Sequence, residues 1–249
     1  MIGGEGYHEN IPHIGLRRHR DIRKRCRIHD LRHLRGLTGP HGDCHIPVMS
    51  VIRTICVYCG SGPGAHPAFI AAARDLGRIL AENRVRLVYG GGSLGLMGAL
   101  ATAVLDHGGE VTGVIPDFLT AREKKLTRAQ EVIVTRNMHE RKQIMFERAD
   151  AFVALPGGIG TLEETIEQMT WAQLGRHKKP IVLANIEAFW DPLCALLDHM
   201  KELAFIRPGL PVEPIVVGRV EDILPRVRAA VARLDEAEIV EAAPTIQRM

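Results

Sequence analysis

The stretch that most constrains this chain is the glycine-rich segment 155–164, Leu-Pro-Gly-Gly-Ile-Gly-Thr-Leu-Glu-Glu. A short apolar run precedes it and a segment with helical periodicity follows it, which predicts a strand, a glycine turn and a helix. Glycines let the backbone approach a ligand. The unpaired amides and the positive dipole end of the first helical turn attract an anion. The segment therefore predicts a site for a phosphate or another anion, with Glu164 one turn into the helix.

The same residues have a purely architectural interpretation. Thr161 and Glu164 have the spacing of a capping box, in which Thr161 caps the helix and Glu164 reaches back to the Thr161 backbone N–H. This arrangement needs no ligand. The spacing alone leaves both interpretations open.

Composition excludes several classes of protein. The chain has 249 residues, 46% of them hydrophobic, and no apolar run approaches the length of a membrane span. The N-terminus lacks the apolar centre of a secretory signal, so we expect a cytoplasmic protein without a membrane partner. Cys56 lies in the predicted strand 54–58 and Cys59 directly follows it, and in an extended chain residues three apart point to opposite faces. We therefore expect neither a redox pair nor a metal site.

The basic residues concentrate at the N-terminus. Residues 1–53 hold ten Lys/Arg against five Asp/Glu, and seven of the twelve histidines. Residues 17–35 could form a basic helix that meets nucleic acid, a membrane surface or an organelle importer, but their apolar stripe is ragged, which favours a disordered extension. Met49 stands just before the first strand and could be a natural start. Residues 236–249 are expected to be a fraying C-terminal tail.

From Thr54 onward, short apolar segments alternate with segments of helical periodicity. The expected strands are 54–58, 86–89, 110–115, 132–135, 151–155, 180–184 and 214–217. The expected helices begin near 67 and within 90–98, and lie near 138–149, 161–174, 190–203 and 220–234. Right-handed crossovers then predict an α/β domain over 54–235, a Rossmann-like doubly wound parallel sheet with helices on both faces. Its ligands should bind beyond the carboxyl ends of the strands, where the glycine clusters fall.

A second glycine cluster suggests an alternative ligand. Gly90, Gly92 and Gly95 match G-x-G-x-x-G after a strand, and Asp117 ends the next strand, where a ribose would bind. A dinucleotide-binding protein is therefore one alternative. The separate anion site at 157–160 favours a small phosphorylated ligand held from two sides. A P-loop is excluded, because no Lys-Ser or Lys-Thr pair follows the glycines.

Residues 138–142, Met-His-Glu-Arg-Lys, form a third cluster at the start of a predicted helix. Arg141 and Lys142 could project toward the same crevice, or the run could be a solvated helix face, as charged runs usually are. The combination of a fixed cation and Glu164 near two phosphate-compatible loops favours the functional interpretation.

At these residues the chain resembles a known family. Segment 156–164 matches the P-G-G-x-G-T-x-x-E signature of the Lonely Guy family of cytokinin riboside 5′-monophosphate phosphoribohydrolases, and 138–142 looks like its second signature. The resemblance covers roughly residues 54–234. Family members often carry the label lysine decarboxylase, which finds no support here because the sequence shows no recognisable pyridoxal-phosphate lysine context.

The resemblance implies hydrolysis of the N-glycosidic bond of a purine nucleoside 5′-monophosphate, of the AMP or N6-isopentenyl-AMP type, without a cofactor or metal. It implies Arg141 and Glu164 as catalytic residues, with the carboxylate stabilising positive charge on the ribose. The implied substrate-binding residues are Gly91, Gly92, Ser93, Gly95, Met138, Lys142, Gly157, Gly158, Gly160 and Thr161.

The family is usually dimeric, so the resemblance also implies a homodimer. Trp171 and Met169 could lie on the covered helix face, or they could belong to the core of one chain. A non-catalytic nucleotide or molybdenum-cofactor carrier is a further alternative, since a fold does not determine a function. The presence of both Arg141 and Glu164 favours the enzyme.

Overall fold

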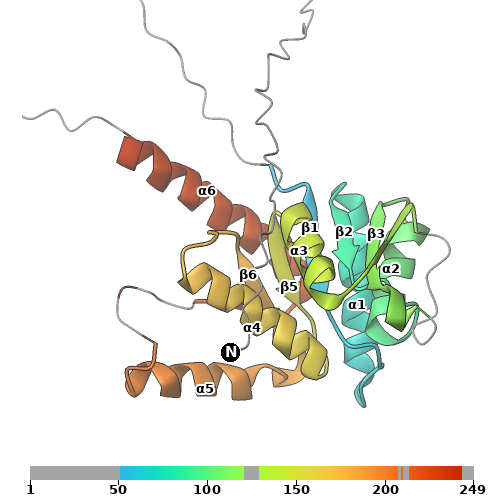
Figure 1. Cartoon of the computed structure of the whole chain (residues 1–249), viewed down its shortest axis with the longest axis horizontal. Helices are drawn as coiled ribbons and strands as arrows, with labels where there is room; N and C mark the ends of the chain where they lie inside the picture. Colours follow the sequence, from blue (N-terminus) through green and yellow to red (C-terminus); the bar gives the residue numbers. More distant parts are fainter. Residues whose placement is uncertain (1–50, 121–128, 207–208, 210–212, 243–249) are drawn as a thin grey trace, which may run out of the picture. The chain divides into compact units, whose positions relative to one another are not determined.

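The computed structural model describes residues 51–120, 129–206, 209 and 213–242, which lie within one unit spanning Pro47–Met249 (Figure 1). Residues 1–50 of the expected N-terminal extension, including Met49, and residues 243–249 of the expected tail lie outside the described residues.

The unit is built on a seven-stranded parallel sheet in the order β4-β3-β2-β1-β5-β6-β7. Its strands are β1 (Thr54–Tyr58), β2 (Arg86–Tyr89), β3 (Val111–Pro116), β4 (Glu131–Thr135), β5 (Ala151–Ala154), β6 (Ile181–Ala184) and β7 (Ile215–Val217). The chain winds outward from β1 to β4, returns to the other side of β1, and winds outward again to β7. This confirms the predicted doubly wound, Rossmann-like fold.

Helices connect the strands, as the alternating pattern predicts. They are α1 (Pro67–Glu82), α2 (Gly95–Asp106), α3 (Met138–Arg148), α4 (Ile159–Gln173), α5 (Asp191–Glu202) and α6 (Ile223–Ala242), with 3₁₀ turns at Asp117–Leu119, Ile186–Ala188 and Val220–Asp222. Helix α6 continues past Asp235, where the apolar spacing ends. Among the described residues, none of these helices combines the length and apolarity needed to cross a bilayer.

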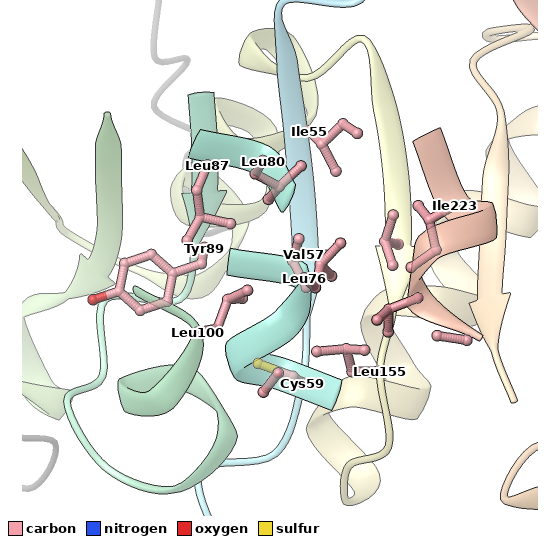
Figure 2. Close-up of a cluster of buried hydrophobic side chains, with 14 of the residues drawn as sticks. Ile55, Val57, Cys59, Leu76, Leu80, Leu87, Tyr89, Leu100, Leu155 and Ile223 are labelled. Atoms are coloured by element: carbon pink, nitrogen blue, oxygen red, sulfur yellow. The ribbon is translucent and has the colours of Figure 1, made fainter. Parts of the chain in front are cut away.

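The two faces of the sheet carry separate apolar clusters. Helices α1, α2 and α6 cover one face, where Ile55 and Val57 of β1 pack with Leu76 of α1 (Figure 2). Helices α3, α4 and α5 cover the other. The central strands are buried on both faces, which explains their nearly continuous apolar sequences. Cys56 and Cys59 belong to opposite clusters, as predicted, so they do not form a redox pair.

The register of the central strands brings three glycine-rich segments to one edge. Val57 of β1 lies opposite Tyr89 of β2, and Tyr58 of β1 lies opposite Ala154 of β5. The segments that follow β1, β2 and β5 therefore emerge together at the carboxyl edge. The winding direction of the chain reverses between β1 and β5, which is where open α/β sheets bind ligands.

Candidate active site

A cavity of about 320 Å³ opens at this reversal point. Its walls come from β1 and from the segments that follow β1, β2, β3, β4 and β5. The lining residues are Val57, Cys59, Gly60, Ser61, Gly90, Met97, Leu119, Met138, Arg141, Gly158, Ile159, Gly160, Thr161, Glu163 and Glu164. The cavity thus combines residues of both signature motifs at the edge where the fold predicts a ligand.

Arg141 and Glu164 form a buried ion pair in the cavity wall. Asn137 starts α3 by accepting a hydrogen bond from the Glu140 backbone N–H at 2.9 Å, which places Arg141 in the first turn. Arg141 donates through Nε to the Val114 carbonyl at 3.1 Å and through Nη1 to Oε1 of Glu164. Arg141 is 8% exposed and Glu164 is 7% exposed. The two proposed catalytic residues are therefore in contact, although they come from different helices.

Gly90 provides the space for this guanidinium group. A Cβ atom at position 90 would lie 2.6 Å from Nη2 of Arg141 and 3.1 Å from Sδ of Met97. The sequence pattern attributes Gly90 to a dinucleotide motif, but its contact here is steric. The glycine lets Arg141 lie directly against the end of β2.

Helix α4 presents an open N-terminus beside this pair. The helix begins at Ile159 and its N-cap residue is Gly158, and no side chain in the described part of the chain caps it. Thr161 lies inside the first turn, and Glu164 bonds Arg141. The capping-box interpretation is therefore wrong. Gly158, Ile159 and Gly160 are exposed, so the first-turn amides and the positive end of the helix dipole are available to an anion in the cavity.

Gly157 allows two loops to pack closely. A Cβ atom there would overlap Oγ1 of Thr161 and would lie 2.9 Å from the Gly60 backbone nitrogen. The Gly60 N–H in turn donates to the Pro156 carbonyl at 3.1 Å. Gly157 does not line the cavity, but it holds the loop after β5 against the loop after β1.

The glycine cluster after β2 leads into a helix start whose amides bond to the loop after β1. The N–H groups of Leu96 and Met97, at the start of α2, donate to the Gly60 carbonyl at 3.1 and 3.3 Å. These amides would bind a pyrophosphate in a dinucleotide site, so their use argues against that alternative. Asp117 is exposed in its 3₁₀ turn. Of the predicted ligand residues in this cluster, the cavity lining does not include Gly91, Gly92, Ser93 or Gly95.

Lys142 also lies outside the cavity lining. Its Nζ is 2.6 Å from Oε1 of Glu163 and 2.8 Å from Oε1 of Glu167, and the residue is only 9% exposed. Burial lowers the pKa of Lys142, but the hydrogen bonds to Glu163 and Glu167 outweigh it and raise that pKa overall. Lys142 is thus a charged residue paired with carboxylates.

The surroundings of Glu164 control its ionisation. Burial raises the pKa of Glu164 above its ordinary value of 4.5, while Arg141 opposes that shift. Burial also raises the pKa of the Cys59 thiol, so Cys59 is a neutral wall residue and a poor nucleophile. The cavity therefore contains one carboxylate that an arginine holds in place and an open helix terminus.

Sequence reasoning misses several lining residues. Cys59, Met97, Leu119, Ile159 and Glu163 line the cavity but are absent from the predicted site. Glu163 and Ile159 fall inside the signature motif, so their position in the sequence could have indicated them. Leu119 has no such signal, because only the fold brings the turn after β3 to the cavity.

Comparison with known proteins identifies the family. The family model described as "Possible lysine decarboxylase" matches residues 97–227. A cytokinin riboside 5′-monophosphate phosphoribohydrolase of Arabidopsis thaliana is 40% identical over 208 residues, which cover 80% of this chain and 98% of the relative. The chain belongs to the Lonely Guy family. A second Arabidopsis thaliana member with the same description is 43% identical over 189 residues, covering 76% of this chain and 84% of that one. A Lonely Guy family member from Oryza sativa subsp. japonica is 51% identical over 157 residues, which cover 63% of this chain and 65% of that relative.

Solved structures share the Lonely Guy fold at lower identity. The molybdenum cofactor binding protein from Rippkaea orientalis has a TM-score of 0.56 and 22% identity, covering 72% of this chain and 97% of that one. A molybdenum cofactor carrier protein from Chlamydomonas reinhardtii has a TM-score of 0.54 and 23% identity, and the match covers 73% of this chain and 98% of that one. At this identity the likeness shows a shared fold alone.

Proposed function

We propose that this chain hydrolyses the N-glycosidic bond of purine nucleoside 5′-monophosphates, with N6-modified bases of the cytokinin type as its substrate class. A water oxygen bonds to C1′ of the ribose, the electron pair of the C1′–N9 bond leaves with the base, and the base gains a proton. The products are the free base and ribose 5-phosphate. The names of relatives that are 40–51% identical support this assignment.

The observation that carries the proposal is the buried Arg141–Glu164 pair beside the uncapped start of α4. In this arrangement the 5′-phosphate binds the first-turn amides of α4 and fixes the ribose. The binding energy of the phosphate thereby helps to position the N-glycosidic bond, which is remote from the phosphate, for cleavage. Glu164 then stabilises positive charge on the ribose and orients the water. Arg141 orients Glu164 and opposes its protonation.

The remaining wall suits a base with an apolar substituent. Met97, Leu119 and Met138 line the cavity, and Ile159 contributes a side chain that is 82% exposed. These unbranched or aliphatic groups offer contact to a flat base and to an alkyl group on N6.

A substrate panel tests the proposal. Purified protein is incubated with N6-isopentenyl-AMP, AMP and the two corresponding nucleosides, and the released base is measured by chromatography. We expect cleavage of the monophosphates and little cleavage of the nucleosides, because loss of the phosphate anchor releases the ribose from its fixed position. Equal rates on a monophosphate and its nucleoside would contradict the phosphate site.

A carrier function is the alternative that the fold allows. A carrier needs the anion-binding helix end but has no use for a carboxylate held in place by an arginine, so the buried pair favours the hydrolase. Binding of AMP without release of adenine or any other base from the panel would favour the carrier.

Dimeric assembly is a second part of the proposal. Leu196 and Met200 of α5 and its C-cap residue Leu203 are exposed at helical spacing, and such an apolar stripe fits the same stripe on a second copy. Met169 of α4 is 3% exposed and belongs to the apolar cluster that α3, α4 and α5 form on the sheet, which supports the intramolecular alternative for this residue. Trp171 is half-buried and stacks edge-on against Phe146.

A cytoplasmic location stays a prediction from the sequence.

A further inference from the structure

Two adjacent cations on α3 face three carboxylates on α4. Arg141 pairs with Glu164, and Lys142 pairs with both Glu163 and Glu167. The pairs join the N-terminal part of α3 to the second and third turns of α4, beside the cavity. Oε2 of Glu167 is buried and has no hydrogen-bond partner among the described residues. Within this cluster the acids outnumber the cations, so each cation matters to the charge that a phosphorylated ligand meets.

The geometry divides these groups between the cavity and the layer behind it. Glu163 and Glu164 line the cavity, whereas Lys142 and Glu167 do not. The side chain of Lys142 is 11% exposed and that of Glu163 is 51% exposed. Among the described residues, Glu163 is the partner through which Lys142 reaches the ligand space. Without Lys142, the Glu163 carboxylate would present an uncompensated negative charge to the incoming phosphate.

We propose that Lys142 is a positioning residue, which neutralises Glu163 and holds the start of α4 against α3, and that it does not bind the phosphate directly. The inference rests on the proposed function, because it assigns a role within the same site. It differs from the role that the sequence resemblance implies, in which Lys142 contacts substrate.

The charges around Glu164 give this role a distinct signature. Arg141 and Lys142 face it from α3, Glu163 is its neighbour on α4, and Cys56, Tyr58 and Cys59 of β1 lie within electrostatic reach. Burial keeps the β1 groups neutral by raising the pKa of each. Burial is the largest influence on the pKa of Glu164 and raises it, and Arg141 lowers it. The smaller influences are Glu163, which raises this pKa, and Lys142, which lowers it. Removing Lys142 alone should therefore raise that pKa further.

The test compares Lys142→Met with the double variant Lys142→Met/Glu163→Gln. For Lys142→Met we expect about tenfold weaker binding of AMP. In the pH profile of kcat, we expect the acidic limb, where activity falls as Glu164 is protonated, to move to higher pH. The double variant lacks the uncompensated charge of Glu163, the one of the two Lys142 partners that lines the cavity. It should therefore recover most of the AMP affinity and most of the original pH dependence of kcat. A double variant that binds AMP as weakly as Lys142→Met would show that the charge of Glu163 does not cause the loss of affinity, and would overturn the proposal.

Glu163→Gln alone keeps the test decisive if Lys142→Met does not fold. Of its two carboxylate partners in the described chain, Lys142 then keeps Glu167. AMP should therefore bind at least as tightly as to the wild type, and the acidic limb of the pH profile should move to lower pH. Weaker AMP binding with an unmoved limb would overturn the proposal. AMP affinity is measured by calorimetry, which needs no turnover. A protein that binds AMP as expected but releases no base would refute the hydrolase while leaving the role of Lys142 intact.

Discussion

At the scale of single residues, the ionisation of Glu164 controls the activity that we propose. Its pKa is raised by burial, and the carboxylate form is the one that stabilises a cationic ribose. Activity should therefore fall as the pH falls through a pKa that lies above the ordinary value of 4.5. We expect the acidic limb of kcat for N6-isopentenyl-AMP above that value, with circular dichroism unchanged across the same range. A limb at or below 4.5 would contradict the burial effect.

Gly90 affords a test of how closely Arg141 must be positioned. In Gly90→Ala the new methyl group lies 2.6 Å from Nη2 of Arg141, which displaces the guanidinium group from Glu164. Misplacement of this kind costs on the order of a hundredfold in kcat/KM. The melting temperature should change little, because the end of a flexible side chain can move. Gly62→Ala is the matched control, since no atom of the described residues lies within 4 Å of its Cβ position.

At the scale of elements, the packing between the loops after β1 and β5 sets the position of the α4 N-terminus. Gly157→Ala brings a methyl group against Thr161 and the Gly60 backbone, and we expect a loss of about 1–3 kcal/mol in the free energy of unfolding. Gly160→Ala is the control, because its Cβ position is open and it lies within the first turn of α4. Thermal unfolding measures both. Equal stability of the two variants would show that the loops can separate without cost.

Elements were largely predictable from the sequence, because hydrophobic periodicity reports burial. The expected strand 86–89 agrees with β2, and most other boundaries agree within a residue. The start of α4 is earlier than expected, since Gly158 rather than Thr161 is its N-cap. The partners of Lys142 were not predictable: a charged residue at the start of a helix can face solvent, substrate or another helix, and only the packing of α3 against α4 decides among these.

The same limit applies to the cavity. The motifs predicted that Arg141 and Glu164 share one edge of the sheet, because carboxyl ends of parallel strands meet there. They could not show that the amides of Leu96 and Met97 are bound by Gly60, because this contact joins loops far apart in sequence. The second glycine cluster therefore resembles a ligand-binding loop in the sequence, whereas in the fold the helix start that follows it is hydrogen-bonded to the loop after β1.

At the scale of the whole molecule, the apolar stripe on α5 predicts self-association. Met200→Glu places a charge among Leu196 and Leu203, and a buried unpaired charge opposes an interface. We expect the wild type to sediment as a dimer and the variant as a monomer. Glu202→Lys, a charge change at an exposed position that points away from the stripe, should remain dimeric. A wild type that stays monomeric at high concentration would refute the dimer.

The central claim is that Glu164 acts chemically in the cavity at the carboxyl edge of the sheet. The most direct measurement is the turnover of N6-isopentenyl-AMP by Glu164→Gln and by the wild type, at equal concentrations of folded protein. Glutamine keeps the length and a hydrogen bond to Arg141 but removes the negative charge. We predict that kcat falls by on the order of a hundredfold or more, while AMP binding and the fold persist. A Glu164→Gln protein that turns over substrate like the wild type would contradict this account.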